Sequence, residues 1–243
     1  QSRSSAASDV YKRQIWNDDG KPIAYVHYTY YERLNVKNKE NRPIMISFNG
    51  GPGSGSVWMH LAYTGPMILN VDDEGFPVQP YGAKKNPHSI IDVGDIVFVN
   101  PVNTGYSRII DKDVKRDKFF GVNADIAYLA EWINTFIQRV NRWESPKYLI
   151  GESYGTTRVS GLAHALQNRQ WMYLNGVILV SPTELGIDTG QGRRSGPLGA
   201  ALRLPYFTAA AWYHKKLDVK YQMIRLLDVL DQSEKYALSL IHI

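Results

Sequence analysis

Residues 147–155 read KYLIGESYG, and this stretch decides how the rest of the chain is interpreted. An apolar run of strand-forming residues ends at Gly151, Ser153 follows two positions later, and Gly155 follows two positions after that. A G-x-S-x-G turn between a strand and a helix strains the backbone of its serine, so that the hydroxyl projects above the sheet. The stretch therefore predicts a strand, a sharp turn and a helix, with Ser153 as a candidate nucleophile. Because Gly and Ser are common residues, an ordinary strand–loop–helix connection also fits these five positions.

The segments around this stretch alternate between strand and helix patterns. Residues 42–48, 95–100 and 175–180 are short apolar runs, which are typical of strands buried on both faces. Residues 21–34 are rich in β-branched and aromatic residues and also predict a strand. Apolar residues recur at helical spacing in residues 122–140 and predict an amphipathic helix. Alternating strands and helices predict an α/β fold with a mostly parallel sheet and helices on both of its faces.

Two further loops follow predicted strands. Residues 49–56 read NGGPGSGS, and residues 100–107 read NPVNTGYS. Ligands bind beyond the carboxyl ends of the strands in such sheets, so we expect both loops and the Ser153 turn to meet at one crevice. The glycines allow main-chain N–H groups to approach a negative group closely, although a tight turn without a ligand is the alternative. The glycine-rich loop at residues 49–56 lacks the G-x-G-x-x-G spacing and the Gly-Lys-Ser/Thr ending of nucleotide-binding loops.

Composition limits the class of protein. The 243 residues, 44% of them hydrophobic, suffice for one large α/β domain with a sizeable core. Lysines and arginines are scattered and no nucleic-acid motif is present, so the net charge of +5 predicts no nucleic-acid partner. No apolar stretch approaches the ~20 residues that a membrane span needs, so no membrane association is expected. The chain has no cysteine, and no histidine pair has metal-ligand spacing, so we expect neither disulfides nor a metal or other cofactor.

Nucleophilic attack by a serine on a carbonyl group requires several partners. A base must take the serine proton, an acid must hold that base, and hydrogen-bond donors must stabilise the negative oxygen. In a nucleophile turn, one donor is the N–H of the next residue, here Tyr154, and the other comes from the loop after an earlier strand. The glycine loop at residues 49–56 is in the right place for that second donor.

Taken together, the three motifs resemble those of the serine carboxypeptidases. NGGPG at residues 49–53, NPVNTGYS at 100–107 and GESYG at 151–155 occur in the order and rough spacing of that family. The resemblance covers roughly residues 21–217, and segments such as TTR at 156–158 look like the bacterial branch. It implies an α/β-hydrolase fold, an enzyme that removes single residues from peptide C-termini, and hence a peptide partner with a free C-terminus.

The same resemblance assigns roles to single residues. It implies that Ser153 is the nucleophile and that the N–H groups of Gly51 and Tyr154 form the oxyanion hole. Two positions depart from the family pattern: Ser47 stands where many members carry tryptophan, and Ser54 where many carry cysteine. The first departure affects the pocket for the substrate carboxylate.

The resemblance further implies that Asn49, the N–H of Gly50 and Glu152 bind the terminal carboxylate of the substrate. Two carboxyl groups within hydrogen-bonding distance cannot both stay ionised cheaply, so Glu152 should share a proton with the substrate. Activity should then favour acidic pH. The alternative is that Glu152 is a solvated acid at the start of a helix, where negative charge is favourable.

The family's catalytic Asp and His lie on later strands, after a helical insertion. We expect this chain to stop inside that insertion and to be inactive alone, because both residues are absent. The acids Asp125 and Asp188 belong to the wrong segments for this role. The histidines have no such role either and are expected to be ordinary surface or core residues: His27, His60, His88, His164, His214 and His242.

The expected organisation has four parts. Residues 15–183 form the α/β-hydrolase core, and residues 184–236 begin the helical insertion, or cap. Residues 1–14 lack periodicity, and we expect them to be a non-native or disordered tail; residues 237–243 end without a cap, and we expect them to be a non-native tail. No signal peptide is visible; a periplasmic or secreted location follows from the resemblance alone, and the oligomeric state is not readable.

Two other functions fit the same features. An esterase or acyltransferase can use the same scaffold, since a fold does not fix the substrate. A non-catalytic binding module is the second alternative, and the missing base is its only support. The pairing of Asn49 with Glu152 favours a peptide substrate over that of an esterase or acyltransferase.

Overall fold

The computed structural model describes residues 6–182 and 197–241. The chain forms two compact units, Gln1–Thr183 and Glu184–Ile243. None of the helices in the two described stretches combines the length and the apolar character that crossing a membrane requires.

In the described part of the first unit, seven strands form one sheet and two more form a small separate sheet. In chain order the strands are β1 (Ala6–Trp16), β2 (Pro22–Arg33), β3 (Ile44–Phe48), β4 (Met67–Leu69), β5 (Ala83–Lys85), β6 (Asp95–Asn100), β7 (Arg108–Ile109), β8 (Lys147–Glu152) and β9 (Gly176–Val180). The large sheet has the order β1-β2-β6-β3-β8-β9, with β7 paired to β2. Its last four strands, β6, β3, β8 and β9, run parallel, whereas β2 is antiparallel to its neighbours.

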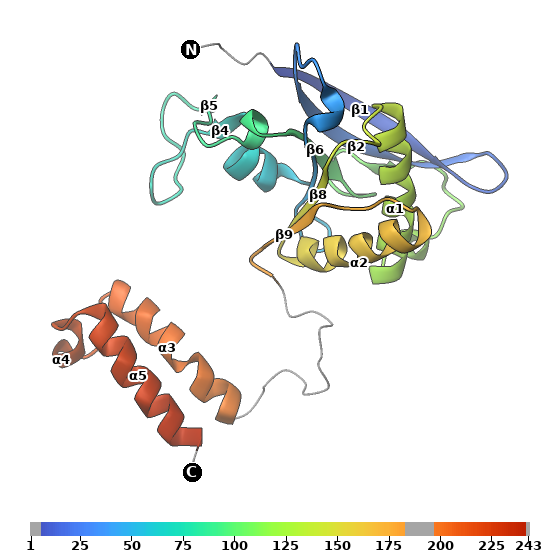
Figure 1. Ribbon diagram of the computed structural model, residues 1–243. Helices are drawn as coiled ribbons and strands as arrows, with labels where there is room; N and C mark the ends of the chain where they lie inside the picture. The colour runs from blue at the N-terminus through green and yellow to red at the C-terminus, as the bar shows by residue number, and fades with distance from the viewer. Residues whose placement is uncertain (1–5, 183–196, 242–243) are drawn as a thin grey trace. The chain divides into compact units, whose positions relative to one another are not determined.

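Two long helices accompany this sheet, α1 (Val122–Arg139) and α2 (Tyr154–Arg169). They contact each other on one face of the sheet (Figure 1). Shorter helical segments lie in the connections: η1 (Lys39–Asn41), the π-helix η2 (Met59–Thr64), η3 (Ile90–Asp92) and η4 (Arg116–Lys118). The second unit contains α3 (Pro197–Tyr213), α4 (Val219–Gln222) and α5 (Leu226–Ile241), with α3 packed on α5.

Strand β3 shows how the sheet separates two cores. Its alternate residues Ile44, Ile46 and Phe48 join the large core with the buried apolar stripe of α1. Because side chains alternate across a strand, Met45 joins a smaller cluster on the other face. There it packs with side chains from η2 and η3, including Met59 and Ile91. The observed sheet and its helices agree with the predicted α/β fold class.

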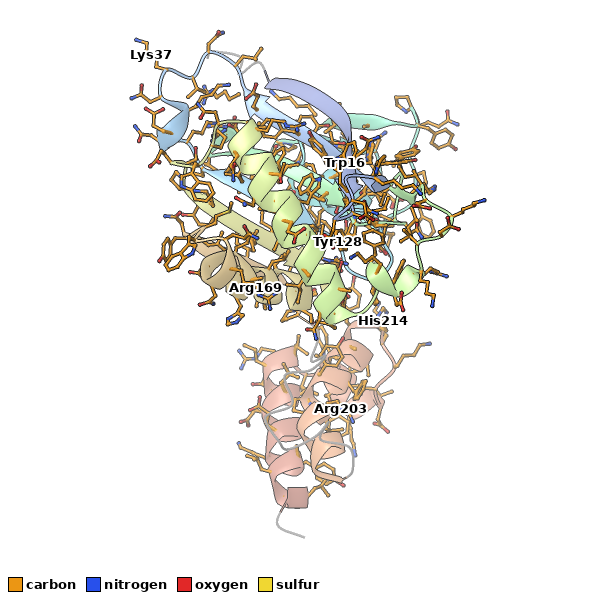
Figure 2. The ribbon with its side chains drawn as sticks, turned by 90° about the vertical axis from the view of Figure 1, so that its right-hand side faces the viewer. Trp16, Lys37, Tyr128, Arg169, Arg203 and His214 are labelled. Atoms are coloured by element: carbon orange, nitrogen blue, oxygen red, sulfur yellow. The ribbon has the colours of Figure 1, made fainter. Side chains whose placement is uncertain are left out.

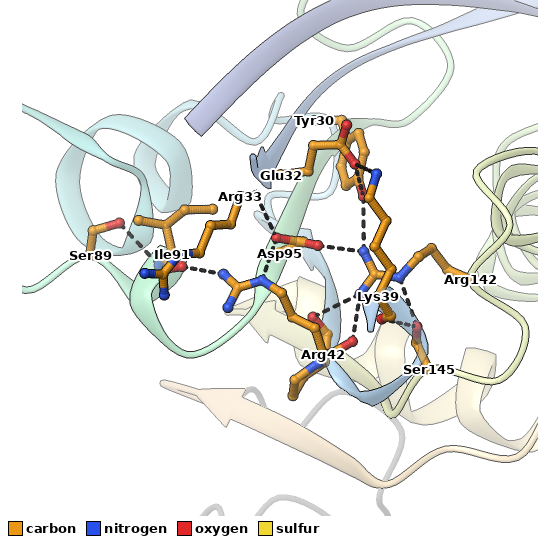
Figure 3. A network of polar contacts seen from close by, with 11 residues as sticks. Tyr30, Glu32, Arg33, Lys39, Arg42, Ser89, Ile91, Asp95, Arg142 and Ser145 are labelled. Atoms are coloured by element: carbon orange, nitrogen blue, oxygen red, sulfur yellow. Dashed lines mark hydrogen bonds and ion pairs between the residues drawn. The ribbon is translucent and has the colours of Figure 1, made fainter. Parts of the chain in front are cut away.

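A buried polar network surrounds Asp95, the first residue of β6 (Figure 3). It lies at the end of the sheet opposite to the Ser153 turn. The Asp95 carboxylate accepts hydrogen bonds from the Nε of Arg42, at 2.7 Å, from the main-chain N–H of Arg33, at 2.9 Å, and from Arg142. Arg142 also donates to the Tyr30 hydroxyl and to the main-chain carbonyl of Arg42. The network therefore joins β2, β3, β6 and the end of α1.

The two predicted tails lie partly in regular structure. Ala6–Trp16 form β1, which pairs with β2 along its length, and α5 continues to Ile241. An edge strand is held mainly by main-chain hydrogen bonds, which leave little trace in the pattern of side chains. Whether residues 1–14 and 237–243 are native stays a prediction, as does the role of residues 184–236 as an insertion.

The helices of the second unit begin and end differently from the prediction. The sequence of residues 204–217 and 220–230 is helix-compatible and predicts two helices there, with Pro205 in a first turn. In the structure α3 begins at Pro197, itself a favourable first helical residue, and Pro205 lies inside it.

The expectation that β9 is buried is wrong. Val177, Ile178 and Leu179 are 37%, 45% and 46% exposed. β9 is the last strand of the sheet in the described residues, so it has a paired neighbour, β8, along one edge only. An apolar sequence predicts a strand, but its burial depends on what packs against it.

An exposed apolar edge strand is a template for association with another chain. We expect this chain, expressed alone, to self-associate, and we expect Ile178→Lys to shift it toward monomer. Val93→Lys is the control, because Val93 is 67% exposed but lies outside the sheet. Light scattering after size-exclusion chromatography measures the effect. Equal behaviour of the two variants, or a monodisperse unmodified chain, contradicts it.

Candidate active site

The Ser153 turn has the geometry that the sequence predicts. Ser153 joins β8 to α2 with φ 56° and ψ −126°, a conformation that L-residues rarely adopt and that costs roughly 1–3 kcal/mol. Its N–H donates to the carbonyl of Val180 at 3.0 Å. A Cβ added to Gly151 would lie 2.1 Å from the carbonyl oxygen of Gly155. Only glycine fits at position 151, so the pattern reflects a steric requirement.

The glycine loop after β3 passes directly against this turn. A Cβ added to Gly50 would lie 2.5 Å from the main-chain N of Tyr154 and 2.6 Å from the carbonyl oxygen of Glu152. Gly51 adopts φ 111°, which favours glycine. The structure therefore brings the backbone of Gly50 next to the Tyr154 N–H.

Asn49 and Glu152 are in direct contact. The Asn49 amide Nδ2 donates to the Glu152 carboxylate Oε2 at 2.9 Å. The Asn49 Oδ1 accepts from the main-chain N–H of Met59 at 2.9 Å, which fixes the orientation of the amide. Asn49 is 1% exposed. Ser47, the departure from the family pattern, is also buried, and its hydroxyl has no hydrogen-bond partner among the described residues.

The third motif, at residues 100–107, folds around Asn100. The Asn100 Oδ1 accepts from the N–H of Ser56 at 2.8 Å, which ties this loop to the glycine loop. The Ser107 hydroxyl donates to the carbonyl of Asn100 at 2.6 Å. All three motifs therefore gather at the carboxyl ends of β3, β6 and β8, as expected. A cavity of about 640 Å³ lies elsewhere, between α1 and the β1–β2 pair, and neither Asn49 nor Ser153 lines it.

A buried ion pair that sequence reasoning missed lies beside these loops. The Arg158 Nε donates to the Asp125 Oδ2 at 2.7 Å, and the Arg158 Nη1 donates to the carbonyl of Asn49 at 2.9 Å. Burial raises the pKa of Asp125, and the Arg158 guanidinium opposes that rise. From the sequence, Asp125 lies in the wrong segment for a catalytic acid, and the sequence motifs predict no other role for it. The sequence does contain one signal for this pair: Asp125 stands among the apolar positions of the helix predicted at residues 122–140. A buried charge needs a partner of opposite charge, so this position predicts a buried ion pair.

Tyr128 extends this pair to the third loop. Its hydroxyl accepts from the main-chain N–H of Val102 at 3.0 Å and donates to the Asp125 carboxylate at 3.4 Å. Tyr128 lies on α1, as labelled in Figure 2. The pair of Asp125 with Arg158 is thus connected to the glycine loop, to α2 and to the loop at residues 100–107.

The histidines near the site have other partners. The His60 Nε2 lies 2.7 Å from the Tyr31 hydroxyl, and its ring stacks on Phe98. Burial, with a smaller effect of nearby His27, lowers the pKa of His60 to about 4. The His27 Nδ1 lies 2.9 Å from the Asn100 Nδ2. In the part of the chain that is described, no histidine is hydrogen-bonded to Ser153, whereas Asp188 and His242 fall outside it.

Within residues 6–182 and 197–241, no three His, Cys, Asp or Glu residues gather in a way that could hold a metal ion.

Comparison with known proteins gives consistent matches. A family model described as serine carboxypeptidase matches residues 17–183. The vitellogenic carboxypeptidase of Aedes aegypti is 29% identical over 157 residues, covering 63% of this chain and 30% of that protein. The pheromone-processing carboxypeptidase KEX1 of Saccharomyces cerevisiae is 28% identical over 161 residues, covering 62% of this chain and 21% of that protein. The chain thus spans less than a third of the length of these two relatives.

A solved structure confirms the fold. The crystal structure of a prohormone-processing carboxypeptidase from Saccharomyces cerevisiae matches with a TM-score of 0.61 at 18% identity. The match covers 98% of this chain and 48% of that one. The predicted α/β-hydrolase fold is therefore confirmed.

The contact between the glycine loop and the serine turn predicts a stability difference. Gly50→Ala should lower the free energy of unfolding by roughly 3 kcal/mol, because the added Cβ meets main-chain atoms that cannot move aside. Gly53→Ala in the same loop meets nothing within 4 Å and bears only the strain of φ 108°. Its loss should be smaller, about 1–2 kcal/mol. Urea unfolding of the full-length protein measures both, and an equal or smaller loss for Gly50→Ala contradicts the geometry.

Proposed function

We propose, since this chain belongs to the serine carboxypeptidase family, that it carries the nucleophile and the carboxylate site of an enzyme that releases single residues from peptide C-termini. One observation supports this most: Asn49 donates to Glu152, the residue directly before Ser153. A buried amide and a carboxyl group are thus paired next to Ser153, which supports a site for a carboxylate there. A simple esterase has no need of such a pair, because its substrate bears no carboxylate at that position.

Substrate binding follows from the chemistry of this pair. The Asn49 Nδ2 and the Gly50 N–H donate to the terminal carboxylate of the peptide. Glu152 contributes an O–H when the two carboxyl groups share one proton, since two adjacent carboxylates would repel each other. Binding at this point sets the scissile carbonyl above Ser153, because it lies one residue from the chain end.

The reaction then proceeds in two halves. The Ser153 hydroxyl oxygen attacks the scissile carbonyl carbon, while its proton passes to a base. The oxyanion that forms is held by the N–H groups of Tyr154 and Gly51; removing one such donor typically costs about 10²–10³ in kcat. The C–N bond breaks, the terminal amino acid leaves with a proton on its nitrogen, and water hydrolyses the acyl-enzyme. We propose that the base and the acid that orients it lie outside the residues described here.

The nucleophile is tested by Ser153→Ala in the full-length protein that contains this chain. Release of the C-terminal amino acid, measured by liquid chromatography, should fall by about 10⁶-fold in kcat, the loss found when a serine nucleophile is removed. Ser160→Ala, on the exposed side of the same helix, is the control and should keep its activity. Comparable turnover by Ser153→Ala and the unmodified protein rules out this mechanism.

The shared proton is tested by Glu152→Gln. In the unmodified protein the KM for a peptide should rise with pH. The enzyme–peptide complex needs one proton shared by the two carboxyl groups, and protons become less available as the pH rises. Glutamine donates a hydrogen bond at every pH, so the KM of the variant should vary much less across the same range. Initial rates between pH 4 and 8 provide the comparison. The same pH dependence in both proteins would show that Glu152 does not share a proton with the substrate.

A further inference from the structure

We infer that Arg158, oriented by Asp125, is a positioning residue that fixes the peptide plane between Asn49 and Gly50 and so aims the Gly50 N–H at the substrate carboxylate. The inference rests on the proposed function, which assigns that N–H to carboxylate binding. It adds the residue that holds the donor in place.

The contacts of Arg158 suit this role. It lies on α2 one turn beyond the serine turn, and it is 2% exposed. Its Nη1 donates to the Asn49 carbonyl at 2.9 Å, and its Nε donates to Asp125 at 2.7 Å. The guanidinium lies 5.1 Å from the ring centre of Tyr154 and 5.6 Å from that of Phe48. Both hydrogen bonds and both rings restrict its position.

Planarity connects this hydrogen bond to the substrate site. The Asn49 carbonyl and the Gly50 N–H belong to one trans peptide unit and point in opposite directions. A hydrogen bond that fixes the carbonyl therefore fixes the direction of the N–H. Gly50 needs such a constraint, because glycine has no Cβ to restrict its rotation and a Cβ there would strike Tyr154.

The Asn49 side chain does not supply the constraint. Its Oδ1 accepts from the Met59 N–H, and one of the two N–H groups of its Nδ2 donates to Glu152. These bonds orient the amide of the side chain and leave the following peptide plane to be set by the main-chain carbonyl. Arg158 is the side chain that donates to this carbonyl.

Asp125 explains why an arginine stands here. A buried guanidinium requires a carboxylate partner, and its planar fork reaches two acceptors in fixed directions, which a lysine ammonium cannot do. The Asp125 carboxylate also faces the Tyr128 hydroxyl, at 3.4 Å, and is hydrogen-bonded by Tyr154. Arg158 is thus held before substrate arrives.

The chain offers a matched control in Arg142. It is as buried as Arg158, pairs with a buried aspartate, Asp95, and donates to the main-chain carbonyl of Arg42. That network lies at the amino-terminal ends of β3 and β6, whose carboxyl ends lead into two loops of the candidate site (Figure 3). A change there should weaken the fold without touching the carboxylate site.

The kinetic test uses the full-length protein that contains this chain, with Arg158→Met and Arg142→Met. Each variant is assayed on a peptide with a free C-terminal carboxylate and on the same peptide amidated. Arg158→Met should raise the KM of the free acid by about 10-fold or more, with a smaller change in kcat, because a hydrogen bond to a charged group is misaligned. Its preference for the acid over the amide should fall by a similar factor. Arg142→Met should lose stability and keep that preference.

Arg158→Lys guards against a variant that fails to fold. The lysine retains the positive charge and can reach one of the two acceptors, Asp125 or the Asn49 carbonyl. The preference of this variant for the free acid over the amide should therefore lie between those of the unmodified protein and Arg158→Met. If both Arg158 variants lose stability but retain the preference of the unmodified protein, as Arg142→Met does, the inference is overturned.

A second measurement does not depend on turnover. In the ¹⁵N-labelled protein, Arg158→Lys should shift or broaden the amide resonance of Gly50, and Arg142→Lys should leave it in place. An unchanged Gly50 resonance in Arg158→Lys overturns the inference. If the unmodified protein releases no C-terminal residue, the proposed function fails, and the Gly50 resonance alone then decides whether Arg158 fixes the peptide plane.

Discussion

The close approach of the glycine loop to the serine turn is the constraint on which the rest of the site depends. Gly50 lies so near the Tyr154 N and the Glu152 carbonyl that no side chain fits there. This contact brings the backbone of the glycine loop against the main-chain N of Tyr154, which is the arrangement that the proposed oxyanion hole requires. Because both loops begin at the ends of adjacent parallel strands, β3 and β8, the sheet itself sets their distance. The strain at Ser153 is tolerated because the surrounding packing holds it.

Two buried ion pairs stand at opposite ends of these strands and have different consequences. Arg142 and Asp95 join strand beginnings to the end of α1, whereas Arg158 and Asp125 meet beside the loops at the strand ends. A buried pair is weak evidence for stability, since desolvation can cost more than the attraction returns. Its geometric precision is the stronger reason to expect a role in positioning, and only Arg158 contacts a residue of the site.

The sequence predicted those parts of the structure that depend on local chemistry. The glycines at 50, 151 and 155 lie at close backbone contacts, so the three loops and their convergence can be predicted from the sequence. The exposure of β9 could not, because burial depends on which segment covers a strand and not on its own residues. Arg158 and Asp125 lie 33 positions apart in sequence, on two different helices, and no periodic pattern encodes such a contact.

The central claim is that Asn49, Glu152 and Ser153 form one site that recognises a chain end and cleaves the bond next to it. Time-resolved mass spectrometry of a defined peptide, incubated with the full-length protein that contains this chain, tests it most directly. The account predicts successive loss of single residues from the C-terminus, and protection of the same peptide when its C-terminus is an amide. Cleavage at internal bonds, or equal attack on the amidated peptide, would contradict the account.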